Sequence, residues 1–292
     1  MAKKRWVFLS AVFSLAAILA LGGCSRQGQQ LNAIQIKGSD TMVNLGQAWA
    51  EAFMRAHPDV SVAVTGGGSG TGIAALLSRT CDIAELSREL KPEEIAMARE
   101  KGFDPKQITV ALDGLAVVVH PANPLSQLTM EQLAAIFSGG VTNWREVGGS
   151  DMPIVVLSRE VNSGTHVYFK EHVLRGGKKE SQAEFAANAL MLSSSQAIAD
   201  EVAQNTGAIG YFGMGYISPR EKALAIAKDA AAPAVAPTID NVLSQAYPIS
   251  RPLLMVSRGQ PLGLVADFLN FVLSPEGQKL VVKIDFVPVK KI

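Results

Sequence analysis

Short runs rich in β-branched residues alternate with longer helix-like runs along the chain from residue 33 onward. The runs expected to form strands are residues 33–38, 60–65, 81–86, 151–160, 206–216 and 251–259. The runs expected to form helices are residues 43–56, the segment after a glycine loop as far as 78, and residues 91–102, 129–139, 164–174 and 263–283, the last of them broken at Pro275. This alternation predicts helices packed on largely parallel sheets, which is an α/β fold.

Two segments are expected to connect parts of such a fold. The apolar run 108–121 is interrupted by Asp113 and Gly114, and this predicts two strands joined by a hinge. Residues 227–241 are rich in alanine and proline, which is typical of a loop or of a bridge between lobes.

The first residues have the layout of an export signal. A basic start at residues 3–5 precedes an apolar run over 6–21, which is too short for a spanning helix. The sequence Leu21-Gly22-Gly23-Cys24 resembles a bacterial lipobox. It predicts a lipoprotein signal peptide over 1–23, acylation of Cys24 (palmitate-type chains) and a polar tether over 24–31. A plain signal peptide or an uncleaved anchor is the alternative interpretation.

Charge and cysteine content exclude several classes of function. Removal of residues 1–23, which carry three basic residues and no acidic one, changes the formal net charge from +1 to −2. A nucleic-acid-binding protein is expected to carry a clustered basic excess instead. Cys81 is the one cysteine besides Cys24, so an exported chain has no internal disulfide to form. We expect Cys81 to be a small buried residue rather than a catalytic thiol.

Three junctions between a predicted strand and a predicted helix combine hydroxyl side chains with glycine. They are KGSDT (37–41), TGGGSGTG (65–72) and SREVNSGT (158–165), and the third contains Arg159. N–H groups at a helix start lack partners, and the helix dipole adds positive character there, so the junctions favour an anion. Arg159 adds a charged, planar donor.

A nucleotide-binding loop and ordinary helix capping are the two other interpretations of these junctions. Gly67 and Gly72 have the spacing of a P-loop, but Ile73 stands where the lysine is required, which excludes that motif. Ordinary helix capping by Ser, Thr or Asp explains each junction separately. Three such junctions in one chain favour a shared ligand at the carboxyl ends of the strands.

The order of six stretches is similar to that in the phosphate-binding subunits of bacterial phosphate ABC importers, of the short lipoprotein type. They are GSDTM (38–42), GGGSGTG (66–72), LTMEQLAAIFSGGVTNWREVGG (128–149), SREVNSGT (158–165), GAIGYFGMGY (207–216) and ISRPLLM (249–255). The resemblance implies a periplasmic-binding-protein fold, in which two α/β lobes are joined by two hinge crossovers and hold the ligand in the cleft between them. The lobes are expected over 32–113 plus 250–292, and over 114–249.

The same resemblance implies which residues hold the anion. In this family one desolvated phosphate is bound between the lobes by hydrogen bonds. Residue by residue, the implied phosphate ligands are Ser39, Thr41, Met42 (through its backbone N–H), Ser69, Ser87, Arg159, Ser163, Gly164 and Thr165. No metal, catalytic residue or cofactor is implied.

One position departs from the family pattern. Many members carry an aspartate where this chain has Ser87, and that carboxylate accepts the proton of HPO₄²⁻, which sulfate lacks. A hydroxyl can accept the same hydrogen bond but does not repel sulfate. Asp40 is a possible substitute acceptor, although capping of the following helix is its favoured role.

The resemblance favours an exported receptor, anchored to the cell membrane through Cys24, that delivers phosphate to ABC permease subunits as a monomer. A receptor for another oxyanion, such as sulfate, is the first alternative. A phosphate-ester hydrolase is the second, since Ser163 and His166 lie three residues apart at a helix start and Arg159 could stabilise an oxyanion. The hydrolase lacks an orienting third group and a G-x-S-x-G elbow, so no enzyme is expected.

Overall fold

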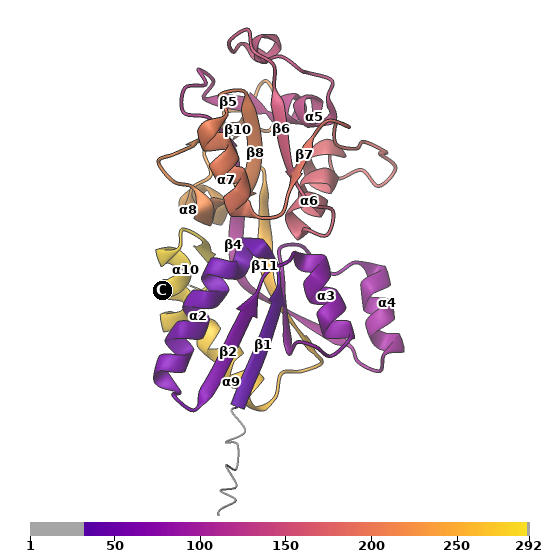
Figure 1. Cartoon of the computed structure of the whole chain (residues 1–292), viewed down its shortest axis with the longest axis vertical. Helices are drawn as coiled ribbons and strands as arrows, with labels where there is room; N and C mark the ends of the chain where they lie inside the picture. Colours follow the sequence, from indigo (N-terminus) through magenta and orange to yellow (C-terminus); the bar gives the residue numbers. More distant parts are fainter. Residues whose placement is uncertain (1–31, 291–292) are drawn as a thin grey trace, which may run out of the picture. The chain divides into compact units, whose positions relative to one another are not determined.

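Parallel strands covered by helices, as the alternating pattern predicts, form both halves of the computed structural model, which describes residues 32–290 (Figure 1). The predicted signal peptide, the predicted lipidation site Cys24 and the predicted tether lie outside these described residues. One large sheet runs in the order β2 (Val60–Thr65), β1 (Asn32–Gly38), β3 (Ile83–Leu86), β11 (Ser250–Arg258), β4 (Pro105–Val119), β8 (Ala208–Gly213), β6 (Val155–Arg159) and β7 (Leu190–Leu192). Within residues 32–290, no helix combines the length and the apolar character that crossing a membrane requires.

The first lobe is built on the strands at the β2 end of this order. Its elements are β1 (Asn32–Gly38), α2 (Val43–Ala56), β2 (Val60–Thr65), α3 (Ser69–Leu77), β3 (Ile83–Leu86) and α4 (Pro92–Glu100). Alternate residues of β3 face opposite cores: Ile83 packs in the cluster that contains α2, and Leu86 packs in the cluster that contains α3. Cys81 is buried as predicted, and burial raises the pKa of its thiol to about 11.

The second lobe is built on the strands at the β7 end. Its elements are β5 (Gln127–Thr129), α5 (Met130–Ser138), β6 (Val155–Arg159), α6 (Gly164–Phe169), β7 (Leu190–Leu192), α7 (Ser195–Gln204), β8 (Ala208–Gly213), β9 (Lys222–Ala223) and β10 (Ala225–Ala227). β6 pairs in parallel with both β7 and β8. Thr129 caps α5 as predicted, because its hydroxyl accepts a hydrogen bond from Gln132 N–H. The predicted helix 164–174 continues past α6 as a π-helical turn.

Two long strands, β4 (Pro105–Val119) and β11 (Ser250–Arg258), connect the lobes (Figure 1). β4 pairs with β11 as far as Gly114, which lies opposite Ser250, and with β8 from Leu115 onward. The prediction of two strands joined by a hinge at Asp113 and Gly114 was therefore wrong. β4 stays continuous because its backbone groups find a new neighbouring strand where the old one ends.

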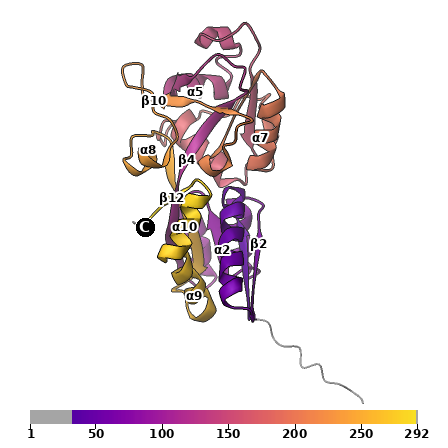
Figure 2. The same cartoon turned by 90° about the vertical axis from the view of Figure 1, so that its left-hand side faces the viewer.

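The end of the chain returns to the first lobe. α9 (Gly263–Val272) and α10 (Pro275–Lys283) lie beside α2 (Figure 2), and the Trp49 indole N–H donates to the Gly277 carbonyl at 2.8 Å. The predicted break at Pro275 is confirmed, with Ser274 as the cap of α10. β12 (Val287–Pro288) then pairs with β4.

The alanine- and proline-rich segment 227–241 precedes β11 in the chain. A short helix, α8 (Ile239–Leu243), begins at its end.

A carboxyl group without a partner lies in the core of the first lobe. The Glu85 side chain is 0% exposed, and neither of its oxygens has a hydrogen-bond partner. A Cβ added at Gly46 of α2 would lie 2.5 Å from Glu85 Oε1, so the carboxyl packs directly against that helix. Burial raises the pKa of Glu85 well above its usual value, which makes the neutral acid the stable form.

Replacement of Glu85 by methionine should stabilise the protein, and more so at higher pH. The folded state holds the Glu85 proton more tightly than the unfolded chain does. The free energy of unfolding therefore falls as pH rises from the usual glutamate pKa through the raised value in the fold. Urea unfolding at several pH values should show a gain at neutral pH of about 1–3 kcal/mol for Glu85→Met.

Glu85→Gln is the matched control, because it keeps a buried polar group and removes only the titration. It should lose the pH dependence without the full gain in stability. Parallel pH profiles for the wild type and Glu85→Met would contradict the assignment of a buried neutral acid.

Candidate functional site

Three loops, each between a strand and the helix that follows it, meet between the two lobes. They follow β1, β2 and β6, and they contain the three junctions that the sequence indicated. Thr41 Oγ1 lies 2.9 Å from Thr165 Oγ1 of the other lobe. The backbone carbonyl of Asn162 accepts a hydrogen bond from Gly70 N–H at 2.9 Å. The side-chain amide of Asn162 donates from Nδ2 to the Gly67 carbonyl at 2.8 Å. The fold thus brings together junctions that are distant in sequence.

Buried hydroxyl groups line the place where the loops meet. Ser69 Oγ lies 3.4 Å from Ser87 Oγ. The backbone of Gly164 approaches both so closely that a Cβ there would overlap the Ser69 hydroxyl and lie 2.8 Å from Ser87 Oγ. This approach across the lobes is possible only because residue 164 has no side chain. We call Thr41, Ser69, Ser87, Ser163 and Thr165 the hydroxyl cluster.

Protein N–H groups already occupy lone pairs on three of these hydroxyls. Ser69 Oγ accepts from Ser87 N–H at 3.1 Å, and Ser163 Oγ accepts from Thr165 N–H at 3.2 Å. Thr41 Oγ1 accepts from Arg251 Nη2 at 3.4 Å. A hydroxyl has one O–H and two lone pairs, so each of these groups can still donate its O–H, either to a ligand or to its neighbour in the Thr41–Thr165 and Ser69–Ser87 contacts. A set of converging donors suits an anion.

The Arg159 guanidinium is 1% exposed, and Arg159 is the last residue of β6, at the start of the junction that also contains Ser163 and Thr165. It donates to Asp40 Oδ2 at 2.8 Å, to the Ser193 carbonyl at 2.8 Å and to Ser195 Oγ at 3.1 Å. Burial lowers the pKa of Arg159 and the Asp40 carboxylate opposes that effect, so the group stays cationic. This guanidinium is a preoriented charged donor held by the second lobe.

Asp40 does not cap the helix that follows it. Its Oδ1 accepts from Gly67 N–H at 3.1 Å and its Oδ2 accepts from Arg159 across the lobes. The preferred capping role was therefore wrong. The carboxylate reaches these partners because a 3-10 turn (Asp40–Met42) precedes α2, and Ser39 rather than Asp40 occupies the N-cap position of that turn.

The other predicted ligands lie at the same place with part of their hydrogen bonding already used. Ser39 is 2% exposed, and its N–H donates to the Glu85 carbonyl at 2.8 Å. The Met42 N–H donates to the Ser39 carbonyl at 3.0 Å within the 3-10 turn. The backbone N–H groups of Ser39 and Met42 already donate within the protein, so the hydroxyl side chains are better placed to donate to a ligand.

The proposed serine–histidine pair of a hydrolase does not form. His166 Nδ1 donates to the Arg159 carbonyl at 2.8 Å and lies 3.3 Å from Ser158 Oγ, whereas Ser163 Oγ accepts from Thr165 N–H. Burial lowers the pKa of His166, so the ring is neutral and its Nδ1 proton is committed to a carbonyl. Among residues 32–290, no group of three or more His, Cys, Asp or Glu side chains is placed to hold a metal ion.

Sequence reasoning did not identify Arg251 or the ionic role of Asp113. Arg251 Nη2 and Nε donate to Asp113 Oδ2 at 2.8 and 3.0 Å, and both side chains are 0% exposed. A signal was present, since Arg251 is a charged residue at the very start of the apolar strand 251–259. The partner could not be found locally because Asp113 lies 138 residues away.

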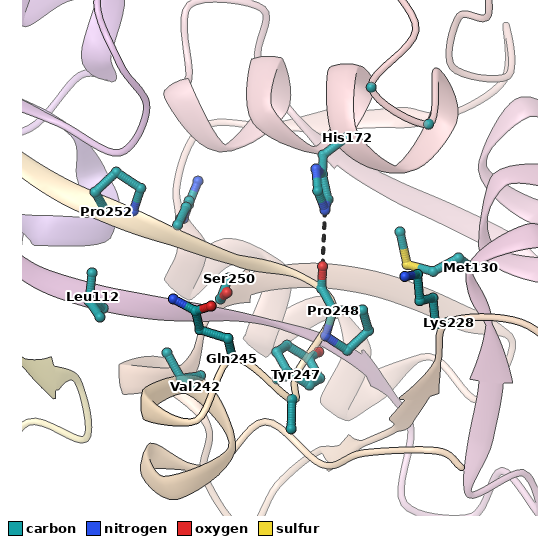
Figure 3. A pocket seen from close by; sticks show the side chains of 14 residues that line it. Leu112, Met130, His172, Lys228, Val242, Gln245, Tyr247, Pro248, Ser250 and Pro252 are labelled. Carbon is teal, nitrogen blue, oxygen red and sulfur yellow. Dashed lines mark hydrogen bonds between the residues drawn. The ribbon is translucent and has the colours of Figure 1, made fainter. Parts of the chain in front are cut away.

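A separate cavity of about 710 Å³ lies beside the crossover strands (Figure 3). His172 lines it and its Nε2 lies 3.0 Å from the Pro248 carbonyl, the hydrogen bond drawn in Figure 3. Arg251 also lines this cavity.

The fold and the site together define a binding protein with two α/β lobes and ligand groups at their junction. Residues 25–276 match a family model described as a PBP superfamily domain. A Pseudomonas aeruginosa protein named phosphate-binding protein PstS is 35% identical over 268 residues, which cover 86% of this chain and 81% of the relative. Protein SphX of Synechococcus elongatus is 34% identical over 263 residues, covering 86% and 76%.

Solved structures agree with these relatives. A Clostridium perfringens protein, described as a phosphate ABC transporter substrate-binding protein with bound phosphate, is 36% identical. It superposes with a TM-score of 0.79 over 89% of this chain and 100% of its own. An ABC-type phosphate transport receptor from Vibrio cholerae is 34% identical, with a TM-score of 0.69 and coverage of 87% and 99%. The chain belongs to the PBP superfamily and, within it, to the family of these phosphate-binding proteins.

Gly164→Ala should hold the lobes apart at the hydroxyl cluster, because the added Cβ would overlap the Ser69 hydroxyl. We expect the affinity for inorganic phosphate, the ligand named for the relatives, to fall about ten- to hundredfold, as for overpacking worth 1–3 kcal/mol. Isothermal titration measures this. Gly140→Ala is the control, since a Cβ there meets the Ala135 carbonyl at an ordinary 3.4 Å. Equal affinities for the two variants would refute the close-approach argument.

Proposed function

We propose that this protein captures inorganic phosphate between its two lobes and delivers it to an ABC importer. The observation that carries the proposal is the hydroxyl cluster, in which Thr41, Ser69 and Ser163 accept from protein N–H groups and can therefore donate their O–H groups to an anion. The buried Arg159 guanidinium, from the same strand–helix junction as Ser163, adds a charged donor. The names of the relatives supply the identity of the anion. The proposed ligands are Ser39, Thr41, Met42, Ser69, Ser87, Arg159, Ser163, Gly164 and Thr165.

Such a site can hold a dianion without a metal ion. Many neutral donors and one guanidinium replace the hydrogen bonds that phosphate loses with its water. Because Thr41, Ser69 and Ser87 belong to one lobe and Arg159, Ser163 and Thr165 to the other, full coordination requires the lobes to close on the ligand. Closure would present a joint surface of both lobes to a permease.

We place the lobe boundary at the exchange of strand partners. One lobe comprises residues 32–113 plus 250–292, and the other comprises 114–249. Gly114 and Ser250 pair at the end of the β4–β11 ladder, and this supports a boundary at these two positions.

Discrimination against sulfate at this site depends on which groups face the proton of HPO₄²⁻. Ser87 has a hydroxyl where a carboxylate would repel an unprotonated oxyanion. Asp40 is the carboxylate nearest to Arg159, with its two oxygens on Gly67 N–H and Arg159 Nη2. A receptor for sulfate or another oxyanion is the alternative function that Ser87 favours.

The first experiment is isothermal titration of the protein, stripped of ligand, with phosphate and then with sulfate at matched ionic strength. Arg159→Ala should cost about 2–5 kcal/mol in phosphate binding, because it removes one partner of a buried charge pair. Arg145→Ala is the matched control, since Arg145 forms an exposed ion pair with Asp151. An unchanged phosphate affinity of the Arg159 variant would contradict the assignment of Arg159 as a ligand. Equal binding of phosphate and sulfate would indicate a broader oxyanion receptor.

We further propose that the chain is exported and held at the cell membrane as a lipoprotein monomer through Cys24. The lipobox-like sequence at 21–24 supports this anchor. Binding rather than catalysis is supported by the commitment of His166 Nδ1 to the Arg159 carbonyl and by the transport names of the relatives.

Cys24→Ser should release the protein from the membrane, because the acyl chains alone would hold it there. Fractionation of cells and labelling with palmitate check this outcome. Cys81→Ser is the control, since Cys81 is buried and its substitution should leave both the label and the membrane fraction unchanged. A labelled or membrane-bound Cys24 variant would contradict the lipid anchor.

A further inference from the structure

The stretch ISRPLLM (249–255) matches the family order, yet the proposed ligands include none of its residues. Its arginine, Arg251, lies on β11 directly opposite Asp113 of β4. The two side chains form an ion pair at 2.8 Å with 0% exposure on either side. Removing two charges from water is costly, so a fully buried ion pair is a weak source of stability compared with apolar packing. The pair therefore calls for an explanation beyond the core.

The Arg251–Asp113 pair lies where the two crossover strands pass between the lobes. Asp113 Oδ1 accepts from Met214 N–H of the second lobe at 3.0 Å. Arg251 Nη1 donates to the Ser87 carbonyl of the first lobe at 3.1 Å. A Cβ added at Gly213 would lie 2.7 Å from Thr41 Cγ2 and 2.9 Å from Asp113 Oδ2, which shows how closely the pair adjoins the hydroxyl cluster.

The donor geometry of Arg251 decides how two proposed ligands are presented. Its Nη2 donates to Thr41 Oγ1 at 3.4 Å, while its Nη1 fixes the backbone of Ser87. Since Thr41 receives an N–H from this side, its single O–H turns toward the meeting place of the loops. Asp113 holds the guanidinium in this orientation by accepting from Nε and Nη2.

We infer that Arg251 is a positioning residue for the bound anion: it acts through Thr41 and Ser87, and Asp113 holds it in place. The inference rests on the proposed function, since it concerns the same site. It adds a second guanidinium behind the hydroxyl cluster, supplied by the crossover strand rather than by a strand–helix loop.

A double-mutant cycle with phosphate tests this inference. The four proteins are the wild type, Arg251→Gln, Thr41→Val and the double variant, each titrated calorimetrically with inorganic phosphate. We expect Arg251→Gln to weaken binding about ten- to hundredfold, as for loss of a charge-assisted hydrogen bond. In the Thr41→Val background, which lacks the hydroxyl, only the contact of Arg251 with the Ser87 carbonyl remains to be lost, so the same substitution should weaken binding about threefold or less.

The cycle separates positioning from a general structural role. A merely structural Arg251 would lower affinity by the same factor in both backgrounds, and additive losses overturn the inference. A wild type that binds phosphate and an Arg251→Gln variant that binds it equally well also overturn it, while the proposed function survives. A wild type that does not bind phosphate overturns both.

Arg251→Lys provides the second variant in case Arg251→Gln does not fold. It keeps a positive charge opposite Asp113, but one ammonium group cannot reach Asp113, Thr41 and the Ser87 carbonyl in the guanidinium geometry. We expect affinity below that of the wild type and the same dependence on Thr41. Full phosphate affinity in Arg251→Lys would show that charge alone suffices and would overturn the positioning role.

Discussion

The rest of the structure depends on the strand β4, whose hydrogen-bond ladder continues without a break although its pairing partner changes from β11 to β8. β4 leaves β11 at Gly114 and meets β8 at Leu115, so the two lobes are joined by regular backbone rather than by a flexible linker. This short connection brings the loops after β1, β2 and β6 to one place. Any change in the angle between the lobes must bend β4 and β11 close to that point, and the Arg251–Asp113 pair lies there.

The charges around the hydroxyl cluster form two pairs of opposite sign. Arg159 is paired with Asp40 across the lobes, and Arg251 is paired with Asp113 between the crossover strands. Each guanidinium is therefore neutralised by a carboxylate even though both are buried, as desolvated charges require. In the proposed site, the anion would gain its affinity from the number and direction of the donors, Ser69 and Thr165 among them, more than from net positive charge. Direction is what distant contacts such as Arg251 to Thr41 control.

Local signals predicted most of the elements and most of the loops at the site. The Thr129 cap, the break at Pro275 and the strand–helix junctions at Ser69 and Ser163 depend on a few neighbouring residues, and all of them were readable in the sequence. The continuity of β4 could not be predicted from the sequence, because it depends on pairing with β8. That strand lies about a hundred residues further along the chain, a separation as long as a typical domain. A glycine in a strand signals a break only when no new partner strand replaces the old one.

The sequence by itself determined the fold class, the hydroxyl and glycine composition of the junctions and the presence of Arg159, because helix capping and glycine flexibility are local properties. Only the tertiary structure decided which charges are paired. In the folded protein Asp40 forms an ion pair with Arg159 instead of capping its own helix. Asp113 forms an ion pair with Arg251, which lies 138 residues further along the chain. The tertiary structure also left Glu85 without a partner in the core. Electrostatic pairing in a buried site depends on which groups lose their water together, and sequence spacing does not encode that.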